Sequence, residues 1–259
     1  METVEAKYAK LAATPSDIHE HLPTLRRYAA ACPDGKIAEL GVRGVVSTWA
    51  MLAGLADGGA PTAHLWAVDV EPAPGIEVAA AAAKQLGIGF EFLQQDSATV
   101  NLPDMDMMFI DTWHVYAHLR SELARHAPRV RRWILLHDTE TDRDAGESVR
   151  LGSDVAQQST QSGYPVANIR QGLRRAVVEF LVANAEWDVV RQYRNNNGLT
   201  VLARRGVAPL SDVHKCPHFF PDPQKCPRCL RHKPQSCRQI LWVPLLIVLV
   251  AVVLAAARR

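Results

Sequence analysis

Short apolar segments of strand length alternate with helix-like segments between residues 15 and 205. Repeated strand–helix units build a parallel sheet covered by helices, so this alternation predicts an α/β domain. The expected strands are 36–40, 64–69, 90–93, 107–110, 133–136, 187–194 and 199–204. The expected helices are one that starts at Thr14-Pro15-Ser16-Asp17, and then 47–55, 77–86, 116–126 and 172–184. The stretch 148–169 is expected to be either a lid or a loop.

The turn Asn195-Asn196-Asn197-Gly198 joins the last two expected strands as a hairpin. The final strand of the sheet should therefore run antiparallel to its neighbours. With 259 residues, the chain is long enough for one sizeable domain and its appendages. We expect a globular domain over 1–206, a Cys/Pro-rich segment over 207–238 and a membrane span over 239–257.

An unbroken run of 18 uncharged, almost wholly apolar residues extends from Ile240 to Ala257. A helix of this length covers roughly 27 Å, which suits the hydrocarbon core of a bilayer. The alternative is a buried helix of a soluble core. More basic residues precede the run than follow it, which favours a cytosolic globular domain on a single-pass, tail-anchored chain. The N-terminus lacks the apolar segment of a signal peptide.

Four cysteines, Cys216, Cys226, Cys229 and Cys237, lie within 22 residues just before this run. The two-residue spacing of Cys226 and Cys229 suits one tetrahedral zinc ion, and His218 or His232 are further candidate ligands. Two alternatives remain open: palmitoylation of Cys237, or an unstructured spacer.

Acidic residues mark the ends of the expected strands. Glu39 lies in the first, just before a loop with Gly41 and Gly44; Asp69 ends the second, Asp96 follows the third and Asp111 closes the fourth. Ligands bind at the carboxyl edge of such a sheet. Glycines let the backbone approach a ligand, and the acid about 28 residues after the first glycine is placed for ribose hydroxyls.

Charge argues against one class of partner. The formal net charge is +2, and no basic stripe with interleaved aromatic residues is present. We therefore expect no nucleic-acid partner.

Three stretches carry a family resemblance: ELGVRGVVST, VDVEP and FIDTWHVY followed by ILLHDT. They resemble class I S-adenosylmethionine-dependent methyltransferases, in particular the sugar O-methyltransferase and cephalosporin-hydroxylase-like group. The resemblance covers about 15–205 and implies a Rossmann-like, doubly wound seven-stranded sheet of order 3-2-1-4-5-7-6. The family often has FIDGDHSY, so Thr112 and Trp113 replace Gly-Asp here, which affects the shape of the acceptor pocket.

The resemblance also implies roles for single residues. The cofactor-binding set would be Glu39, Gly41, Gly44 and Ser47 at the methionine end, Asp69 at the ribose and Asp96 near the adenine. Asp111 and Asp138, with His137 beside them, would hold Mg²⁺. His114 is the candidate general base, acting with Asp111; the alternatives are that it orients Asp111 or caps the next helix. His19 and His21 are expected at the surface.

These features together predict an O-methyltransferase whose acceptor is a sugar hydroxyl of a glycan or lipid-linked saccharide. Methyl transfer is an in-line displacement, and an alcohol acceptor must also lose a proton to a base, with or without help from a metal. One alternative is a membrane-anchored scaffold with an inactive methyltransferase fold. The other is a nicotinamide-dependent oxidoreductase, but its GxGxxG loop is absent.

Overall fold

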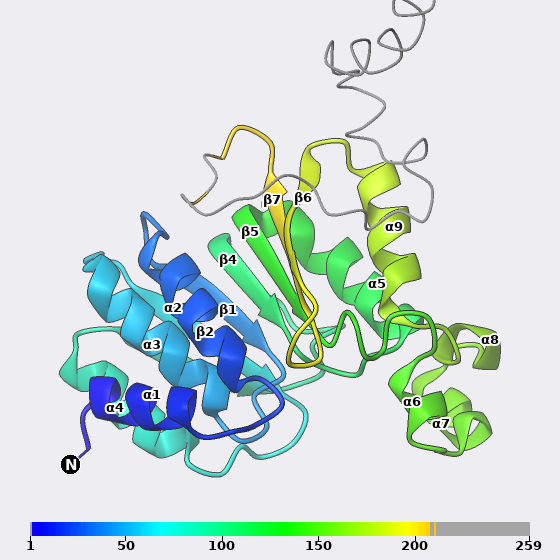
Figure 1. The fold of residues 1–259 in the computed structure, drawn as a ribbon, viewed down its shortest axis with the longest axis horizontal. Coiled ribbons are helices and arrows are strands. Elements are labelled where there is room, and N and C mark those ends of the chain that lie inside the picture. The colour runs from blue at the N-terminus through cyan, green and yellow to red at the C-terminus, as the bar shows by residue number, and fades with distance from the viewer. Residues whose placement is uncertain (1, 208–209, 211–259) are drawn as a thin grey trace, which may run out of the picture. The chain divides into compact units, whose positions relative to one another are not determined.

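The computed structural model describes residues 2–207 and 210, and these form a seven-stranded sheet with helices on both faces (Figure 1). The strand order is β3-β2-β1-β4-β5-β7-β6. The strands are β1 (Lys36–Leu40), β2 (His64–Asp69), β3 (Gly89–Gln94), β4 (Met105–Ile110), β5 (Val130–His137), β6 (Trp187–Tyr193) and β7 (Leu199–Arg204). The first five are parallel, and β7 runs antiparallel to β5 and β6. The predicted α/β class, strand order and closing antiparallel strand are confirmed.

Strand β4 shows how the sheet is buried on both faces. All six of its residues are buried, as expected for a central parallel strand, and five of the six are apolar, the exception being Asp106. Met107 and Phe109 pack into the core beneath α2 (Leu22–Ala30), α3 (Val46–Gly58) and α4 (Ile76–Gln85). On the other face, Ile110 lies beside α5 (Tyr116–His126) and α9 (Leu173–Ala183).

The N-terminal helices differ from the prediction. Thr14–Asp17 does not begin a helix; it follows a separate helix, α1 (Val4–Ala13), which Thr3 caps. The backbone of Thr14 is extended, as the residue before a proline prefers, so α1 ends before Pro15. A 3₁₀ turn, η1 (His19–His21), precedes α2, and Pro23 occupies its first turn.

The stretch 148–169 is mostly helical. It carries α6 (Glu147–Arg150), α7 (Val155–Ser162) and α8 (Val166–Ile169). Val155 and Ile169 form a small apolar cluster with Val115, against which Trp113 and Tyr164 pack. This helical insertion, residues 147–169, is therefore packed against the loop that follows β4.

Two sequence predictions lie outside the described residues. They are the zinc segment with Cys216, Cys226, Cys229 and Cys237, and the membrane span at 239–257. Within the part of the chain that the structure describes, no helix is long and apolar enough to cross a membrane.

Candidate active site

The predicted site residues gather at the carboxyl ends of β1, β2, β4 and β5. The strand order reverses between β1 and β4, which is the switch point where sheets of this type bind ligands. At this point Gly41 has φ +86°, and a Cβ on it would lie 2.0 Å from the carbonyl oxygen of Asp111. Only glycine lets the loop after β1 approach the loop after β4 so closely.

Asp69 organises the glycine loop. Its Oδ2 accepts hydrogen bonds from the backbone N–H groups of Val42 (2.8 Å) and Arg43 (2.9 Å), and its Oδ1 accepts one from Glu71 (3.0 Å). Val45 ends the loop at φ +61°, an unusual conformation for a β-branched residue. The carboxylate thus fixes the loop; Oδ2 uses both of its lone pairs on the backbone, while Oδ1 keeps one for another donor.

Glu39 is wholly buried beneath the same loop. Its carboxylate accepts hydrogen bonds from the hydroxyls of Ser47 (2.5 Å) and Thr48 (2.7 Å), in the first turn of α3. Burial raises the pKa of Glu39 to about 8, despite these two hydrogen bonds, which act to lower it. Glu39 and Ser47 therefore bind each other in this structure.

Glu39 gives a prediction about the pH dependence of stability. Because its pKa rises from 4.5 to about 8 on folding, its stabilising contribution is complete below about pH 4.5 and is lost as the pH rises through about 8. Relative to a Glu39→Gln variant, the wild type should lose up to about 1.4 kcal/mol of unfolding free energy per pH unit across this window. Urea unfolding between pH 5 and 8 measures this, with exposed Glu91→Gln as the control. If the unfolding free energies of the wild type and Glu39→Gln changed in parallel with pH, this prediction would be contradicted.

Asp96 lies further out, in the loop after β3. It is exposed, and its Oδ1 accepts a hydrogen bond from the N–H of Ala98 at 2.8 Å. At the remaining predicted cofactor residue, Gly44, an added Cβ would make one ordinary contact, with Val46 Cγ2 at 3.8 Å. The cofactor contacts of all these residues stay predictions.

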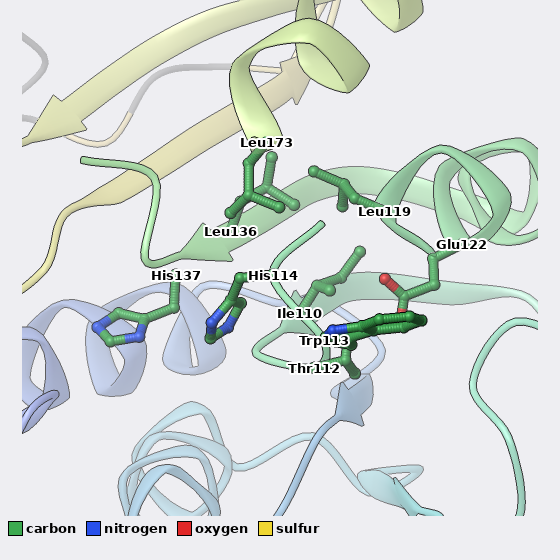
Figure 2. A pocket seen from close by; sticks show the side chains of 9 residues that line it. All are labelled: Ile110, Thr112, Trp113, His114, Leu119, Glu122, Leu136, His137 and Leu173. Carbon is green, nitrogen blue, oxygen red and sulfur yellow. The ribbon is translucent and has the colours of Figure 1, made fainter. Parts of the chain in front are cut away.

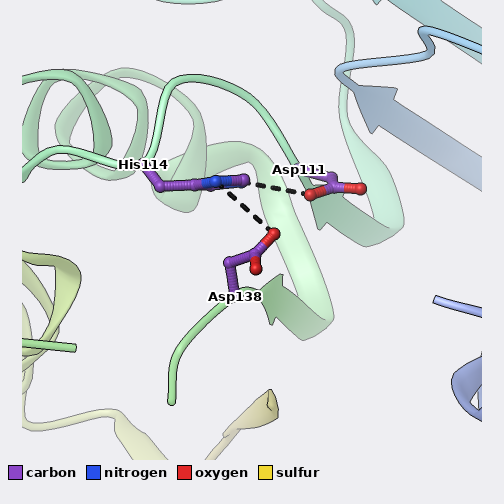
Figure 3. A group of neighbouring side chains, drawn as sticks. All are labelled: Asp111, His114 and Asp138. Carbon is purple, nitrogen blue, oxygen red and sulfur yellow. Dashed lines mark hydrogen bonds and ion pairs between the residues drawn. The ribbon is translucent and has the colours of Figure 1, made fainter. Parts of the chain in front are cut away.

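The predicted catalytic residues do converge (Figure 3). His114 Nε2 lies 3.1 Å from Asp111 Oδ1, and His114 Nδ1 lies 3.4 Å from Asp138 Oδ2. Asp111 follows β4, and Asp138 follows β5 with φ +54°, a rare conformation outside glycine. The ring of His114 therefore lies between two carboxylates that come from neighbouring strands.

Three charged residues of this centre were not predicted from the sequence. Glu147 Oε2 lies 3.2 Å from His114 Nδ1 and also accepts the backbone N–H of His114 at 3.0 Å. Asp142 Oδ2 lies 3.4 Å from the same ring nitrogen, and Arg150 holds Asp142 through two hydrogen bonds of 2.6 and 2.8 Å. Part of the site therefore comes from the helical insertion. The sequence feature that could have indicated these residues is the cluster of acidic residues after Asp138.

These contacts set the charge of the centre. Burial disfavours the charged form of His114, but Asp111, Asp142 and Glu147 outweigh it and hold the pKa of His114 well above 6.5. Burial would raise the pKa of Asp111, yet hydrogen bonds from His114 and His137 lower it well below its usual range. His114 is thus an imidazolium near neutral pH in this arrangement, and it must release a proton before it can act as a base.

His137 is buried and both of its ring nitrogens are engaged. Nδ1 lies 3.2 Å from Asp111 Oδ1 and 3.0 Å from Asp138 Oδ2, and Nε2 lies 3.2 Å from the carbonyl oxygen of Asn196. Although burial lowers it, the pKa of His137 is raised to about 10 by the two carboxylates. In this arrangement His137 offers no nitrogen to a metal and instead orients both carboxylates.

The expectation that His21 lies at the surface is wrong. Its side chain is buried, and its Nε2 lies 3.0 Å from the carbonyl oxygen of Asn195 in the predicted hairpin turn. The ring also meets His137 edge-on, with 5.6 Å between centroids. The N-terminal segment and the hairpin therefore both support the carboxyl end of β5.

The donor set fits a hard divalent cation. Among the described residues, Asp111, His114 and Asp138 form one group whose candidate ligand atoms all lie within 4.8 Å of one another. His114, Asp142 and Glu147 form a second. Carboxylate oxygens are the ligands that Mg²⁺ prefers, so Asp111 and Asp138 fit the predicted ion better than His137 does.

A small pocket opens beside this centre, between the sheet and helices α5 and α9 (Figure 2). Its walls combine apolar and polar side chains, namely those of Ile110, Thr112, Trp113, His114, Leu119, Glu122, Leu136, His137 and Leu173. The two residues that depart from the family pattern both have partners here. Thr112 donates a hydrogen bond to Glu122, and the indole N–H of Trp113 donates one to Ser148 of the helical insertion.

No protein-family model matches this chain, and no curated protein matches it. Among solved structures, it is similar to the O-methyltransferase TomG of Streptomyces achromogenes, in complex with SAM. The identity is 18%, covering 77% of this chain and 90% of that one, with a TM-score of 0.48. An O-methyltransferase from Bacillus cereus in complex with SAH has 17% identity, 79% and 91% coverage and a TM-score of 0.48. The SAH-bound methyltransferase PaMTH1 of Podospora anserina has 14% identity, 78% and 87% coverage and a TM-score of 0.48. A likeness this distant does not assign a cofactor or a substrate to this chain.

Proposed function

We propose that this chain is an S-adenosylmethionine-dependent O-methyltransferase. The observation that carries the proposal is the convergence of Asp111, His114 and Asp138 at the carboxyl ends of β4 and β5. This centre directly adjoins the glycine loop after β1, as the contact between Gly41 and Asp111 shows. A proton acceptor and paired carboxylates beside a ligand-binding loop are what transfer of a methyl group to a hydroxyl needs.

The chain's own residues divide the work in this proposal. The glycine loop and Asp69 bind the methionine and ribose parts of the donor, with Asp96 near the adenine. His114 takes the hydroxyl proton after release of its own, and Asp111 and Glu147 hold its ring in place. Mg²⁺ held by Asp111 and Asp138 would lower the pKa of the acceptor hydroxyl.

The acceptor in this proposal is a sugar hydroxyl of a glycan or lipid-linked saccharide. The family resemblance of the FIDTWH and LLHDT stretches supports it. The apolar run 240–257 agrees with an acceptor at a membrane, to whose cytosolic face the chain would be tethered.

The test is a turnover assay with S-adenosylmethionine and Mg²⁺ against three acceptor sets: free sugars, nucleotide sugars and lipid-linked saccharides. We expect S-adenosylhomocysteine above the acceptor-free background with at least one saccharide, and one added methyl group on that sugar by mass spectrometry. A catechol and a carboxylic acid serve as acceptor controls. Turnover with these but with no saccharide would overturn the sugar assignment.

A specific observation favours a second candidate, the inactive membrane-anchored scaffold. Two proposed donor-binding carboxylates already accept hydrogen bonds from the chain itself: Glu39 from Ser47 and Thr48, and Asp69 from three backbone N–H groups. A scaffold with this fold would not bind the methyl donor, so direct binding separates the two candidates.

A further inference from the structure

Helix α5 carries a stripe of three polar residues: Glu122 and His126 are buried, and His118 is partly buried. Their spacing of four places them on one face of the helix. All three bind Ser97, in the loop after β3. His118 Nε2 lies 3.0 Å from the Ser97 hydroxyl, that hydroxyl donates to Glu122 Oε1 at 2.6 Å, and His126 Nε2 lies 2.7 Å from the Ser97 carbonyl oxygen. The helix therefore holds this loop at Ser97, and Arg125 of the same helix also donates to the carbonyl oxygen of Val100 (2.6 Å) and to Asn101 Oδ1 (2.8 Å).

Glu122 also reaches the loop after β4. The hydroxyl of Thr112 donates to Oε1, the same carboxylate oxygen that binds Ser97, at 2.8 Å. Ser97 directly follows Asp96, and Thr112 directly follows Asp111. A single oxygen atom thus joins the loop of the proposed adenine-side acid to the loop of the proposed catalytic acid.

The second oxygen of the Glu122 carboxylate lowers the stability of the fold. Glu122 is fully buried, and its Oε2 has no hydrogen-bond partner among the described residues. The side chain lines the small pocket next to Trp113 and Thr112 (Figure 2). A buried, half-satisfied carboxylate stabilises a fold less than an apolar side chain of similar volume would. Stability alone therefore does not account for a glutamate at this position.

We propose that Glu122 is a positioning residue that couples the donor-binding loop after β3 to the catalytic loop after β4. The proposal rests on the proposed function, because both loops are taken as parts of one methyl-transfer site. Glu122 touches neither donor nor acceptor in this account. It acts through Ser97 and Thr112, and it keeps Asp96 and Asp111 in a fixed relation while both substrates bind.

Hydrogen exchange of the full chain tests the coupling without any substrate. In Glu122→Leu, where both hydroxyls lose their acceptor, amide exchange in residues 95–101 and 111–115 should rise together, by about tenfold. Glu122→Gln keeps an acceptor oxygen for both hydroxyls, so its exchange should stay near that of the wild type. If Glu122→Leu does not fold, Thr112→Val removes one of the two links and should release residues 111–115.

The matched control is Asp106→Asn. Asp106, the second residue of β4, is also a buried carboxylate; it accepts hydrogen bonds from the N–H groups of Asp34 and Lys36 and pairs with Arg131, at the end of the strands opposite to the two loops. This variant should leave exchange in both loops unchanged. Exchange that rises in only one loop of Glu122→Leu, or equally in Glu122→Gln, would overturn the coupling.

A binding measurement then separates positioning from a merely structural role. In Glu122→Leu the dissociation constant for S-adenosylmethionine should rise about tenfold and turnover should fall, with both rescued in Glu122→Gln. Coupled exchange with unchanged donor affinity and turnover would overturn the positioning role. A wild type that binds no donor would instead refute the proposed function, and the exchange experiment would still decide whether Glu122 couples the loops.

Discussion

Replacing Asp111 by asparagine is expected to slow methyl transfer by about 10²- to 10⁴-fold, the range attributed to a positioned proton acceptor. Asparagine keeps the shape of the side chain but loses the charge that holds two rings. Asp111 Oδ1 forms hydrogen bonds to two ring nitrogens, His114 Nε2 at 3.1 Å and His137 Nδ1 at 3.2 Å. Single-turnover rates with saturating donor measure the effect on chemistry apart from binding.

The same variant has a readout that needs no acceptor. Because Asp111 helps to raise the pKa of His137 to about 10, this pKa should fall towards 6.5 in Asp111→Asn, as followed by NMR of the ring protons. Asp104→Asn, at an exposed acid just before β4, is the control and should change neither rate nor pKa. An unchanged rate in Asp111→Asn would contradict the proposed catalytic centre.

The second large effect is expected from Gly41→Ala. The alanine would have to adopt φ +86°, which costs about 1–2 kcal/mol, and its Cβ would meet the Asp111 carbonyl oxygen at 2.0 Å. Overpacking of this kind adds about 1–3 kcal/mol, so the unfolding free energy should fall by roughly 2–5 kcal/mol. Donor binding should be lost as the two loops move apart. Chemical denaturation and calorimetric titration measure the two effects.

Gly44→Ala provides the matched control within the same loop. Gly44 has an ordinary backbone conformation, and the nearest atom to its added Cβ is Val46 Cγ2 at 3.8 Å. Its unfolding free energy should change by less than about 1 kcal/mol. Equal losses of stability in the two variants would show that the close approach of Gly41 to Asp111 is not the cause.

The sequence predicted the sheet well because its inner parallel strands carry runs of buried apolar residues; the edge strand β3 has no buried residue. Strands β1, β2 and β7 and helix α5 have the predicted bounds, and each inner strand is a short apolar run ending at a polar residue or glycine. The strand order came from the family resemblance. Helix α1 was missed because only Val4 among its residues is buried, so it carries little apolar periodicity.

The candidate site was predicted only in part. Asp111 was found because it closes a strand at the ligand-binding edge of the sheet, whereas His114 and Asp138 were assigned from the family resemblance. Glu147 was missed because its contact with His114 joins residues 33 apart, and no periodic pattern links the helical insertion to the loop after β4. The burial of His21 depends likewise on a tertiary contact, with the hairpin turn at Asn195, which no local pattern reveals.

The central claim is that the site binds S-adenosylmethionine, and calorimetric titration of the donor into the purified chain tests it most directly. Asp69→Asn is the matched variant, because its side-chain oxygen can still accept from Val42 and Arg43 while the charge proposed to bind the ribose is lost. We predict micromolar binding that weakens about tenfold or more in Asp69→Asn, since hydrogen bonds to a charged group are stronger than neutral ones. A folded wild-type chain that gives no binding heat at any temperature tested would contradict the methyltransferase assignment and favour the scaffold.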